Sequence, residues 1–157
     1  MKILVMSDSH GSVESLVSTV ALETPNHVLH LGDYDRDCGA IRLEFPYVEL
    51  RAVRGNCDGG SQQLDVDEFT LDGVRFLMTH GHIFGVKAGI TRIKQHAAYK
   101  GADVLLFGHT HKSHFEIWER KLHVINPGSM GFGSSKSYAV IELDNGNVKC
   151  ELRHLAS

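Results

Sequence analysis

The chain has 157 residues, of which 42% are hydrophobic and 22% charged, and a formal net charge of −3. These values are ordinary for a globular protein, so we expect a single domain over residues 1–157. The acidic balance argues against a nucleic-acid-binding surface, which normally carries a basic excess. The three cysteines are odd in number and widely spaced, which predicts no disulfide framework and favours a cytoplasmic location.

The first two thirds of the chain alternate predicted strands and helices, the pattern of α/β proteins. Lys2 to Met6 is an apolar run of strand length, and we expect neither a signal peptide nor a membrane span there. Further strands are expected over residues 27–31, 48–53, 67–71, 74–78 and 103–107. Helices are expected over residues 13–22, 37–44 and 86–99, the first with Ser12 as its N-cap.

The last third of the chain is expected to be almost entirely β. Strands are predicted over residues 115–118, 122–125, 138–143 and 148–152. Residues 144–147 read as a hairpin turn, as does Asp72-Gly73 earlier in the chain, and residues 126–131 read as a loop.

Five of the predicted strands end in glycine-containing loops that carry potential metal ligands. These ligands are Asp8, His10, Asp33, Asn56, His80, His109 and His111. Alternate residues of an extended chain point to the same side, so we expect Asp8 and His10 to converge on one point. Because sites in α/β sheets form beyond the carboxyl ends of strands, all seven side chains are expected to meet. Seven ligands are too many for one ion and suit two.

The ligand types indicate the chemistry of this site. Carboxylate, amide oxygen and imidazole without thiolate favour Mn, Fe, Zn or Ni over copper(I) or an iron–sulfur centre. Two ions roughly 3.5–4 Å apart, as two-metal hydrolases require, need one bridging carboxylate. Such a pair lowers the pKa of a bridging water and holds phosphoryl oxygens against developing negative charge. The set therefore predicts cleavage of a phosphate ester.

Each of these residues, taken alone, also has a structural explanation. Asp8 and Asp33 suit helix N-caps or turns, Asn56 suits a turn, and a lone buried histidine is more often hydrogen-bonded than a ligand. Their co-occurrence at five strand ends favours the metal site. Six other histidines match no motif and are expected at the surface or at sheet edges: His27, His30, His96, His114, His123 and His154.

The motifs DSH at residues 8–10, GD at 32–33, GN at 55–56, His80 and GHTH at 108–111 resemble the calcineurin-like metallophosphoesterase superfamily. The short length, Cys57 within GNCD and the NPGS loop at 126–129 resemble its small prokaryotic phosphodiesterase branch, which is related to the retromer-subunit fold. The resemblance spans Lys2 to about Ser129. It implies an α/β fold, a four-layer αββα sandwich in which two facing mixed β-sheets are flanked by helices.

The resemblance also implies a division of the ligands between two ions. Metal one would be held by Asp8, His10, Asp33 and His111. Metal two would be held by Asp33, Asn56, His80 and His109, with Asp33 as the bridge. Two divalent ions are expected as cofactors, with Mn first and Ni, Fe, Zn or Mg as alternatives.

Cys57 departs from the wider superfamily, in which many members have a histidine that protonates the leaving oxygen. This argues against protein phosphatase activity and favours a phosphodiesterase with a good leaving group, with Asp58 or His82 as hypothetical proton donors. Residues expected to face substrate are Cys57, Asp58, His82, Asn126 and Ser129. The alternatives are a small packing role for Cys57 and a tight Pro-Gly turn for Asn126 and Ser129.

Together these features predict a binuclear-metal-dependent phosphodiesterase in which a metal-bridging hydroxide attacks a phosphate ester. The expected partner is a small-molecule phosphodiester substrate, with no membrane and no nucleic acid, and a homo-oligomer is left open. The alternatives are a phosphomonoesterase or nucleotide pyrophosphatase, and a non-catalytic protein-binding scaffold. A scaffold can lose ligands without penalty, whereas this chain carries all seven, which favours catalysis.

Overall fold

The computed structural model describes residues 1–131 and 135–155. Its first half forms β1 (Lys2–Met6), α1 (Val13–Glu23), β2 (His27–His30), the 3₁₀ helix η1 (Asp35–Asp37), α2 (Cys38–Glu44), β3 (Glu49–Ala52), β4 (Val66–Leu71) and β5 (Val74–Thr79). Its second half forms the 3₁₀ helix η2 (His82–Phe84), α3 (Thr91–Tyr99), β6 (Val104–Leu106), β7 (His114–Trp118), β8 (Leu122–Asn126), β9 (Ser137–Asp144) and β10 (Asn147–His154). No helix within the described ranges has both the length and the apolar character that a bilayer span needs.

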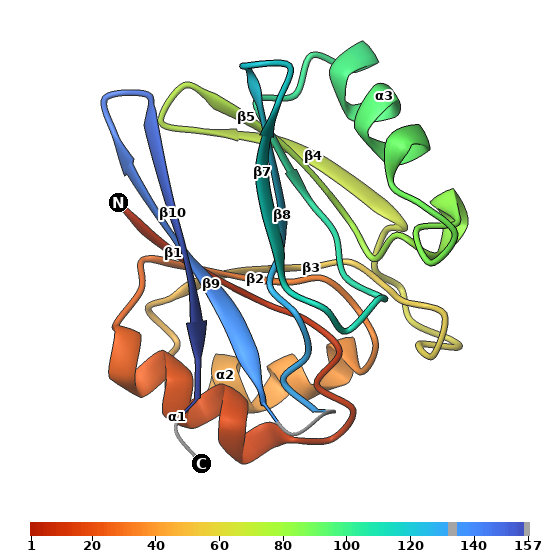
Figure 1. Cartoon of the computed structure of the whole chain (residues 1–157). Helices are drawn as coiled ribbons and strands as arrows, with labels where there is room; N and C mark the ends of the chain where they lie inside the picture. The colour runs from red at the N-terminus through yellow and green to blue at the C-terminus, as the bar shows by residue number, and fades with distance from the viewer. Residues whose placement is uncertain (132–134, 156–157) are drawn as a thin grey trace.

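In the described part of the chain, the strands form two five-stranded mixed sheets. The first has the order β10-β9-β1-β2-β3, with β1, β2 and β3 parallel and the two C-terminal strands antiparallel. The second has the order β4-β5-β6-β8-β7, with β5, β6 and β8 parallel and both edge strands antiparallel. Figure 1 shows α1 and α2 along one side of the molecule and α3 on the other.

The alternation of side chains along β1 assigns the two faces of the first sheet. Ile3 and Val5 point into the core between the sheets, where they join residues such as Phe76 and Leu106 of the second sheet. The alternate residues of β1 face α1 and α2 instead. A third apolar cluster, which includes Ile93, lies between the second sheet and α3. Three buried apolar layers separate four structural layers, which confirms the predicted sandwich.

The hairpin predicted at Asp72-Gly73 connects β4 and β5, which pair in antiparallel register. Both turn residues have positive φ, +49° for Asp72 and +77° for Gly73. This is the geometry of a type I′ turn, which the Asp-Gly pair favours. The prediction of this hairpin is confirmed.

The helix predicted over residues 86–99 is wrong at its start, because α3 begins at Thr91. The preceding segment contains η2 and three glycines with positive φ: +106° at Gly81, +63° at Gly85 and +148° at Gly89. Glycine adopts these conformations without steric penalty, and they interrupt a helical path. Ile93 and Ala97, on the inner face of α3, are fully buried.

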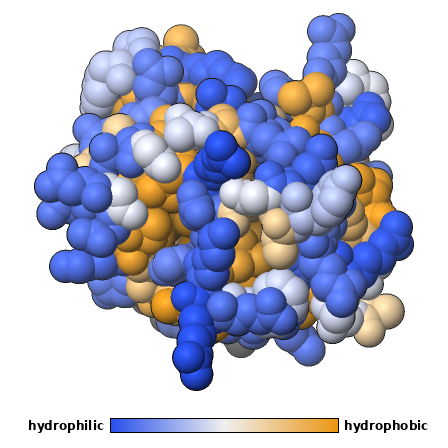
Figure 2. All heavy atoms as spheres, turned by 90° about the horizontal axis from the view of Figure 1, so that it is seen from above, coloured by the Kyte–Doolittle hydropathy of each residue, from blue (hydrophilic) through white to orange (hydrophobic). Residues whose placement is uncertain are grey.

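The end of the sandwich formed by the β4–β5, β7–β8 and β9–β10 hairpins is hollowed between the sheets. Figure 2 shows hydrophobic residues in the hollow among hydrophilic ones. The hollow has a volume of about 540 Å³ and is lined by Gly73, Val74, Asp103, Lys121, His123, Gly146, Asn147, Val148 and Lys149. The residues expected to bind metal lie elsewhere, in the loops beyond the carboxyl ends of the parallel strands.

Candidate metal centre

The loops that carry the candidate ligands begin directly after the parallel strands. The extended chain expected at Asp8 and His10 is not found. Both residues have positive φ, +53° and +45°. Asp33, His109 and His111 also have positive φ, +59°, +71° and +61°. Such conformations are unfavourable for residues with a Cβ and concentrate at functional sites. The side chains therefore converge through tight left-handed turns.

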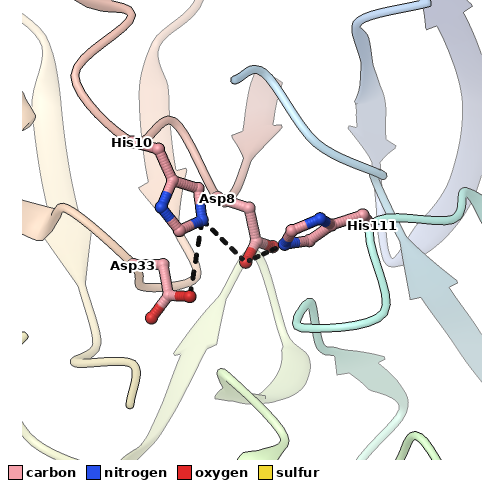
Figure 3. Close-up of side chains that lie close together, drawn as sticks. All are labelled: Asp8, His10, Asp33 and His111. Atoms are coloured by element: carbon pink, nitrogen blue, oxygen red, sulfur yellow. Dashed lines mark ion pairs between the residues drawn. The ribbon is translucent and has the colours of Figure 1, made fainter. Parts of the chain in front are cut away.

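One candidate cluster consists of Asp8, His10, Asp33 and His111, whose donor atoms all lie within 4.8 Å of one another. Figure 3 shows these four side chains pointing toward one another from three separate loops. Asp8 Oδ1 lies 3.3 Å from His111 Nε2 and 3.9 Å from His10 Nε2. His10 Nε2 in turn lies 3.5 Å from Asp33 Oδ2.

A second candidate cluster consists of Asp33, His80 and His109. His80 Nε2 lies 3.5 Å from Asp33 Oδ2 and 3.1 Å from His109 Nδ1. Asp33 Oδ2 is thus the same distance from a histidine of each cluster. The Asp33 carboxylate is common to both, which is the position of the predicted bridge.

Hydrogen bonds outside the clusters orient several of these ligands. His80 Nδ1 lies 2.8 Å from the Leu31 carbonyl oxygen, an arrangement that points Nε2 at the carboxylates. Asp8 Oδ2 accepts from Ser7 Oγ at 2.6 Å and from the His109 backbone N–H at 3.1 Å. Asp33 Oδ1 accepts the Cys57 backbone N–H at 2.9 Å. Each aspartate therefore has one oxygen held by the protein and one directed into the site.

The charges of the site suit a cation. Asp8 is fully buried, and its Oδ1 makes no hydrogen bond of good geometry among the described residues. Burial opposes ionisation of Asp33, but the hydrogen bonds from His80 and Cys57 outweigh it and lower the pKa of Asp33. Burial and the neighbouring His80 lower the pKa of His109 to about 4. Ionised carboxylates beside imidazole nitrogens are a donor set for a divalent ion.

Glycines at the ends of the strands are required by the close packing around the two aspartates. A Cβ on Gly55 would lie 2.2 Å from Asp33 Oδ1. A Cβ on Gly108 would lie 2.2 Å from Ser7 Oγ and 2.9 Å from Asp8 Oδ2. Any side chain at these positions would displace a carboxylate of the site.

Asn56 and Cys57 are exposed beside Asp33, in the loop after β3. Asn56 Nδ2 lies 3.7 Å from Cys57 Sγ, and the Cys57 backbone N–H holds Asp33. Burial and the Asp33 carboxylate raise the pKa of the Cys57 thiol. Cys57 is therefore a neutral thiol near neutral pH, and Asn56 directly precedes the residue whose backbone N–H holds the shared carboxylate.

The predicted substrate-facing residues lie in different settings. The Asp58 carboxylate accepts the backbone N–H groups of Asp33, Tyr34 and Gly55 at 2.6–2.8 Å, and that of Asp35 at 3.2 Å. Asp58 thus organises the loop that carries Asp33. The His82 ring lies 5.4 Å from the His80 ring, at the edge of the second cluster.

Asn126 and Ser129 are buried beneath the site. Asn126 Nδ2 donates to the Gly108 carbonyl oxygen at 3.2 Å and to Thr110 Oγ1 at 2.9 Å. Ser129 Oγ donates to the Asp8 carbonyl oxygen at 2.9 Å. Both residues join the loop after β8 to the backbone of the loops that carry the ligands.

The histidines outside the motifs differ from the prediction at one position. His154 is exposed, and His27, His96, His114 and His123 are partly buried. His30 is fully buried, so its predicted place at the surface or a sheet edge is wrong. The reason is the sheet order, which places β2 between β1 and β3. Sequence analysis also missed Ser9 and Asp37, because only the fold brings them to His30.

The chain is similar to known proteins in sequence. The calcineurin-like phosphoesterase superfamily domain matches residues 1–146. The chain is 36% identical to the probable metallophosphoesterase YsnB of Bacillus subtilis, over 92% of this chain and 86% of that protein. It is 29% identical to the phosphodiesterase YfcE of Escherichia coli K12, over 92% of this chain and 89% of the relative.

The fold is also found in a eukaryotic protein. The crystal structure of a single mutant of Vps29 from Entamoeba histolytica matches with a TM-score of 0.76, over 99% of this chain and 100% of that one. Its sequence identity is 21%, so this likeness concerns the fold alone. The family match and the relatives together show that the chain belongs to the calcineurin-like phosphoesterase superfamily, in the small branch that its motifs predicted.

Proposed function

We propose that this chain is a phosphodiesterase that works with two divalent metal ions, with manganese as the first metal to test. One observation carries the proposal: Asp33 Oδ2 lies 3.5 Å from the Nε2 atoms of both His10 and His80, one from each candidate cluster. A carboxylate shared in this way is what two ions in one hydrolytic site require. The name phosphodiesterase of the relative YfcE also supports this substrate class.

The residues of the two clusters would divide between the ions as the sequence predicts. Asp8, His10, Asp33 and His111 would hold one ion, and Asp33, Asn56, His80 and His109 the other. When bound, such a pair activates water and stabilises the negative charge that develops on phosphoryl oxygens. The protein's own part is to fix the ligands, through the Leu31 carbonyl at His80 and the Cys57 backbone N–H at Asp33.

A pocket of about 220 Å³ borders the proposed centre and is lined by Asp35, Arg36, Cys57, Asp58, Gly59, Gly60 and Ser61. The Arg36 guanidinium stacks 4.4 Å above the Tyr34 ring, which itself lies 5.1 Å from the His10 ring. We propose that this pocket takes one arm of the diester. The cationic guanidinium would attract an anionic substrate to it.

The leaving group is expected to be a good one. Cys57 stands where many superfamily members have a protonating histidine, and its thiol has a raised pKa. Both oxygens of Asp58 are engaged by backbone N–H groups, so we do not propose Asp58 as the proton donor. His82 keeps that role only as an alternative to donation by water. These features support a phosphodiesterase over a phosphomonoesterase whose substrates have poor leaving groups.

Two other functions are outcomes of the same test. A phosphomonoesterase or nucleotide pyrophosphatase would use the same centre on a different ester. A non-catalytic scaffold would have the fold without turnover. The surroundings of Asp8 Oδ1 favour a metal centre over a scaffold, because this buried oxygen faces the imidazole nitrogens of His10, His80 and His111, an array of donor atoms that suits a divalent ion. The three free cysteines support the proposed cytoplasmic location.

The proposal is tested by hydrolysis of an activated phosphodiester and of the matching monoester. Chelated protein is assayed alone and after addition of Mn, Ni, Zn or Mg, together with Asn56→Ala and a control variant, Asp67→Ala. Asp67 pairs with Arg51 away from the centre. We expect metal-dependent diester cleavage that Asn56→Ala weakens and Asp67→Ala leaves unchanged. Preference for the monoester would favour the first alternative. Absence of turnover in folded, metal-loaded protein would favour the scaffold.

A further inference from the structure

A buried hydrogen-bond network joins the loops after β1 and β2, which carry three of the four ligands of the first cluster. Ser9 Oγ lies 2.9 Å from His30 Nε2 and donates to Asp37 Oδ2 at 2.8 Å. Ser9 and His30 are fully buried, and Asp37 is 7% exposed. None of the three residues belongs to the candidate clusters.

The network has a single consistent direction of donation. The Gly32 backbone N–H donates to His30 Nδ1 at 3.1 Å, so Nδ1 is an acceptor. Burial lowers the pKa of His30, which keeps the ring neutral with its proton on Nε2. His30 Nε2 therefore donates to Ser9 Oγ, and the Ser9 hydroxyl proton goes to Asp37. The Asp37 Oδ2 atom also accepts the Gly11 backbone N–H at 2.8 Å.

These three residue types also form catalytic triads, but their order here excludes that role. In a triad the histidine accepts the proton of the serine hydroxyl and is itself oriented by the aspartate. Here the serine hydroxyl donates to the aspartate, and the histidine donates to the serine. The serine is also inaccessible to substrate, since it is fully buried. The remaining role for the network is to hold the backbone of the neighbouring loops in place.

The position of the network indicates what it acts on. Ser9 lies between Asp8 and His10 in the sequence, and Gly11, which Asp37 holds, directly follows His10. Gly32, which His30 holds, directly precedes Asp33. Asp8, His10 and Asp33 all have positive φ, so their backbone needs outside support to keep this shape.

We propose that Ser9, His30 and Asp37 are positioning residues that fix the β1 and β2 loops, and so set the affinity of the Asp8–His10–Asp33–His111 cluster for its ion. This inference rests on the proposed metal centre but not on the reaction assigned to it. Residues that orient metal ligands typically change affinity by about 10–100-fold when they are removed. The His80–His109 cluster shares only Asp33 with these two loops, so its ion is expected to lose less affinity.

The test compares Ser9→Ala with a buried hydroxyl far from the centre. Tyr138→Phe is the matched control, because Tyr138 Oη donates to buried Glu23 at 2.6 Å without touching either cluster. Ser9→Thr, which keeps a hydroxyl, is the rescue variant. Mn²⁺ is titrated into each chelated full-length protein by calorimetry, and the spectrum is recorded by electron paramagnetic resonance. The free energy of unfolding of each variant is measured in chelator, so that stability is determined separately from metal affinity.

We expect Ser9→Ala to weaken one of two Mn²⁺ sites by about 10–100-fold. At limiting Mn²⁺ its spectrum should change from that of a coupled pair to that of an isolated ion. Ser9→Thr should recover most of the affinity. Tyr138→Phe should lose stability in chelator and keep both affinities.

Two results would overturn the inference: wild-type Mn²⁺ affinities in Ser9→Ala despite lost stability, or no Mn²⁺ binding by the wild type. Two bound ions without hydrolysis would contradict the proposed function alone, and the affinity change would still decide the inference. If Ser9→Ala does not fold, Asp37→Asn takes its place, since it preserves the shape and removes the charge. It should weaken the same site several-fold, and unchanged affinity there would count against the network.

Discussion

Two buried charged groups of this protein differ in how they are neutralised. Glu23, 4% exposed, is surrounded by protein donors: Tyr138 Oη at 2.6 Å, Arg153 Nη1 at 2.6 Å and Lys2 Nζ at 3.0 Å. Asp8 is fully buried, and its Oδ1 has imidazole nitrogens nearby but no hydrogen bond of good geometry among the described residues. The first group is neutralised by cationic side chains of the chain, whereas the second faces imidazole nitrogens and would be neutralised by a cation in the proposed centre. Buried acids of the first kind stabilise the fold, whereas those of the second kind mark a site.

The largest expected effect is on catalysis when the shared carboxylate is removed. Asp33→Ala should reduce diester hydrolysis by roughly 1000-fold or more, because both ions lose a ligand. Its free energy of unfolding in chelator should fall little or rise, because a carboxylate facing Asp8 is removed. Steady-state kinetics and urea unfolding of the same preparations measure the two effects. Near-wild-type turnover in Asp33→Ala would contradict the role of Asp33 as the shared ligand of the metal centre.

Removal of Glu23 should do the opposite. Glu23→Ala leaves Arg153 and Lys2 beside a buried cavity and should lower the free energy of unfolding by about 3 kcal/mol. Hydrolysis and Mn²⁺ affinity should stay at the wild-type level. Glu14→Ala, at an exposed position in the first turn of the same helix, should change stability by about 0.5 kcal/mol. Equal losses in the two variants would show that Glu23 is not a stabilising group.

Metal should stabilise the protein, and the gain should depend on the ligand clusters. At a free Mn²⁺ concentration 100 times the dissociation constant, one site adds about 2.7 kcal/mol to the free energy of unfolding. Thermal unfolding with chelator and with Mn²⁺ measures this gain. It should be present in Glu23→Ala and much reduced in Asp33→Ala. A gain in Asp33→Ala as large as in the wild type would place the binding elsewhere.

The pH dependence of stability should also separate the two groups. Burial opposes ionisation of Glu23, but hydrogen bonds from Tyr138 and Arg153 outweigh it and lower its pKa from 4.5 to about 2. A lowered pKa in the folded state means that the stabilisation is full above pH 4.5 and is lost as the pH falls toward 2. The difference in unfolding free energy between wild type and Glu23→Gln, measured in chelator, should shrink by about 3 kcal/mol over that range. A difference independent of pH would contradict the assignment.

Much of the fold could be predicted because local pattern and tertiary role agree. The continuous apolar run of β1 fits a strand in a sheet that is covered on both faces, and the Asp72-Gly73 turn fixes a hairpin. The start of α3 differs from the prediction because the apolar spacing continues through Gly89, whose φ is +148°. Local preference is weaker than backbone geometry there.

The site was predictable in composition but not in geometry. Motifs at strand ends identify residues that the fold gathers, and the structure does gather Asp8, His10, Asp33 and His111. The left-handed turns that aim them could not be read from an extended-chain argument. The Ser9–His30–Asp37 network could not be predicted either, because Ser9 is 21 residues from His30 and meets it only after β1 and β2 pair.

The most direct test of the account is the metal content of the wild type and of Asp33→Ala. Each chelated protein is equilibrated with the same free Mn²⁺ concentration, freed of unbound metal, and analysed for manganese per chain by mass spectrometry. Two ions per chain in the wild type, and no more than one in Asp33→Ala, are the expected results. A single ion in the wild type, or two retained without the Asp33 carboxylate, would contradict a centre built around a shared aspartate.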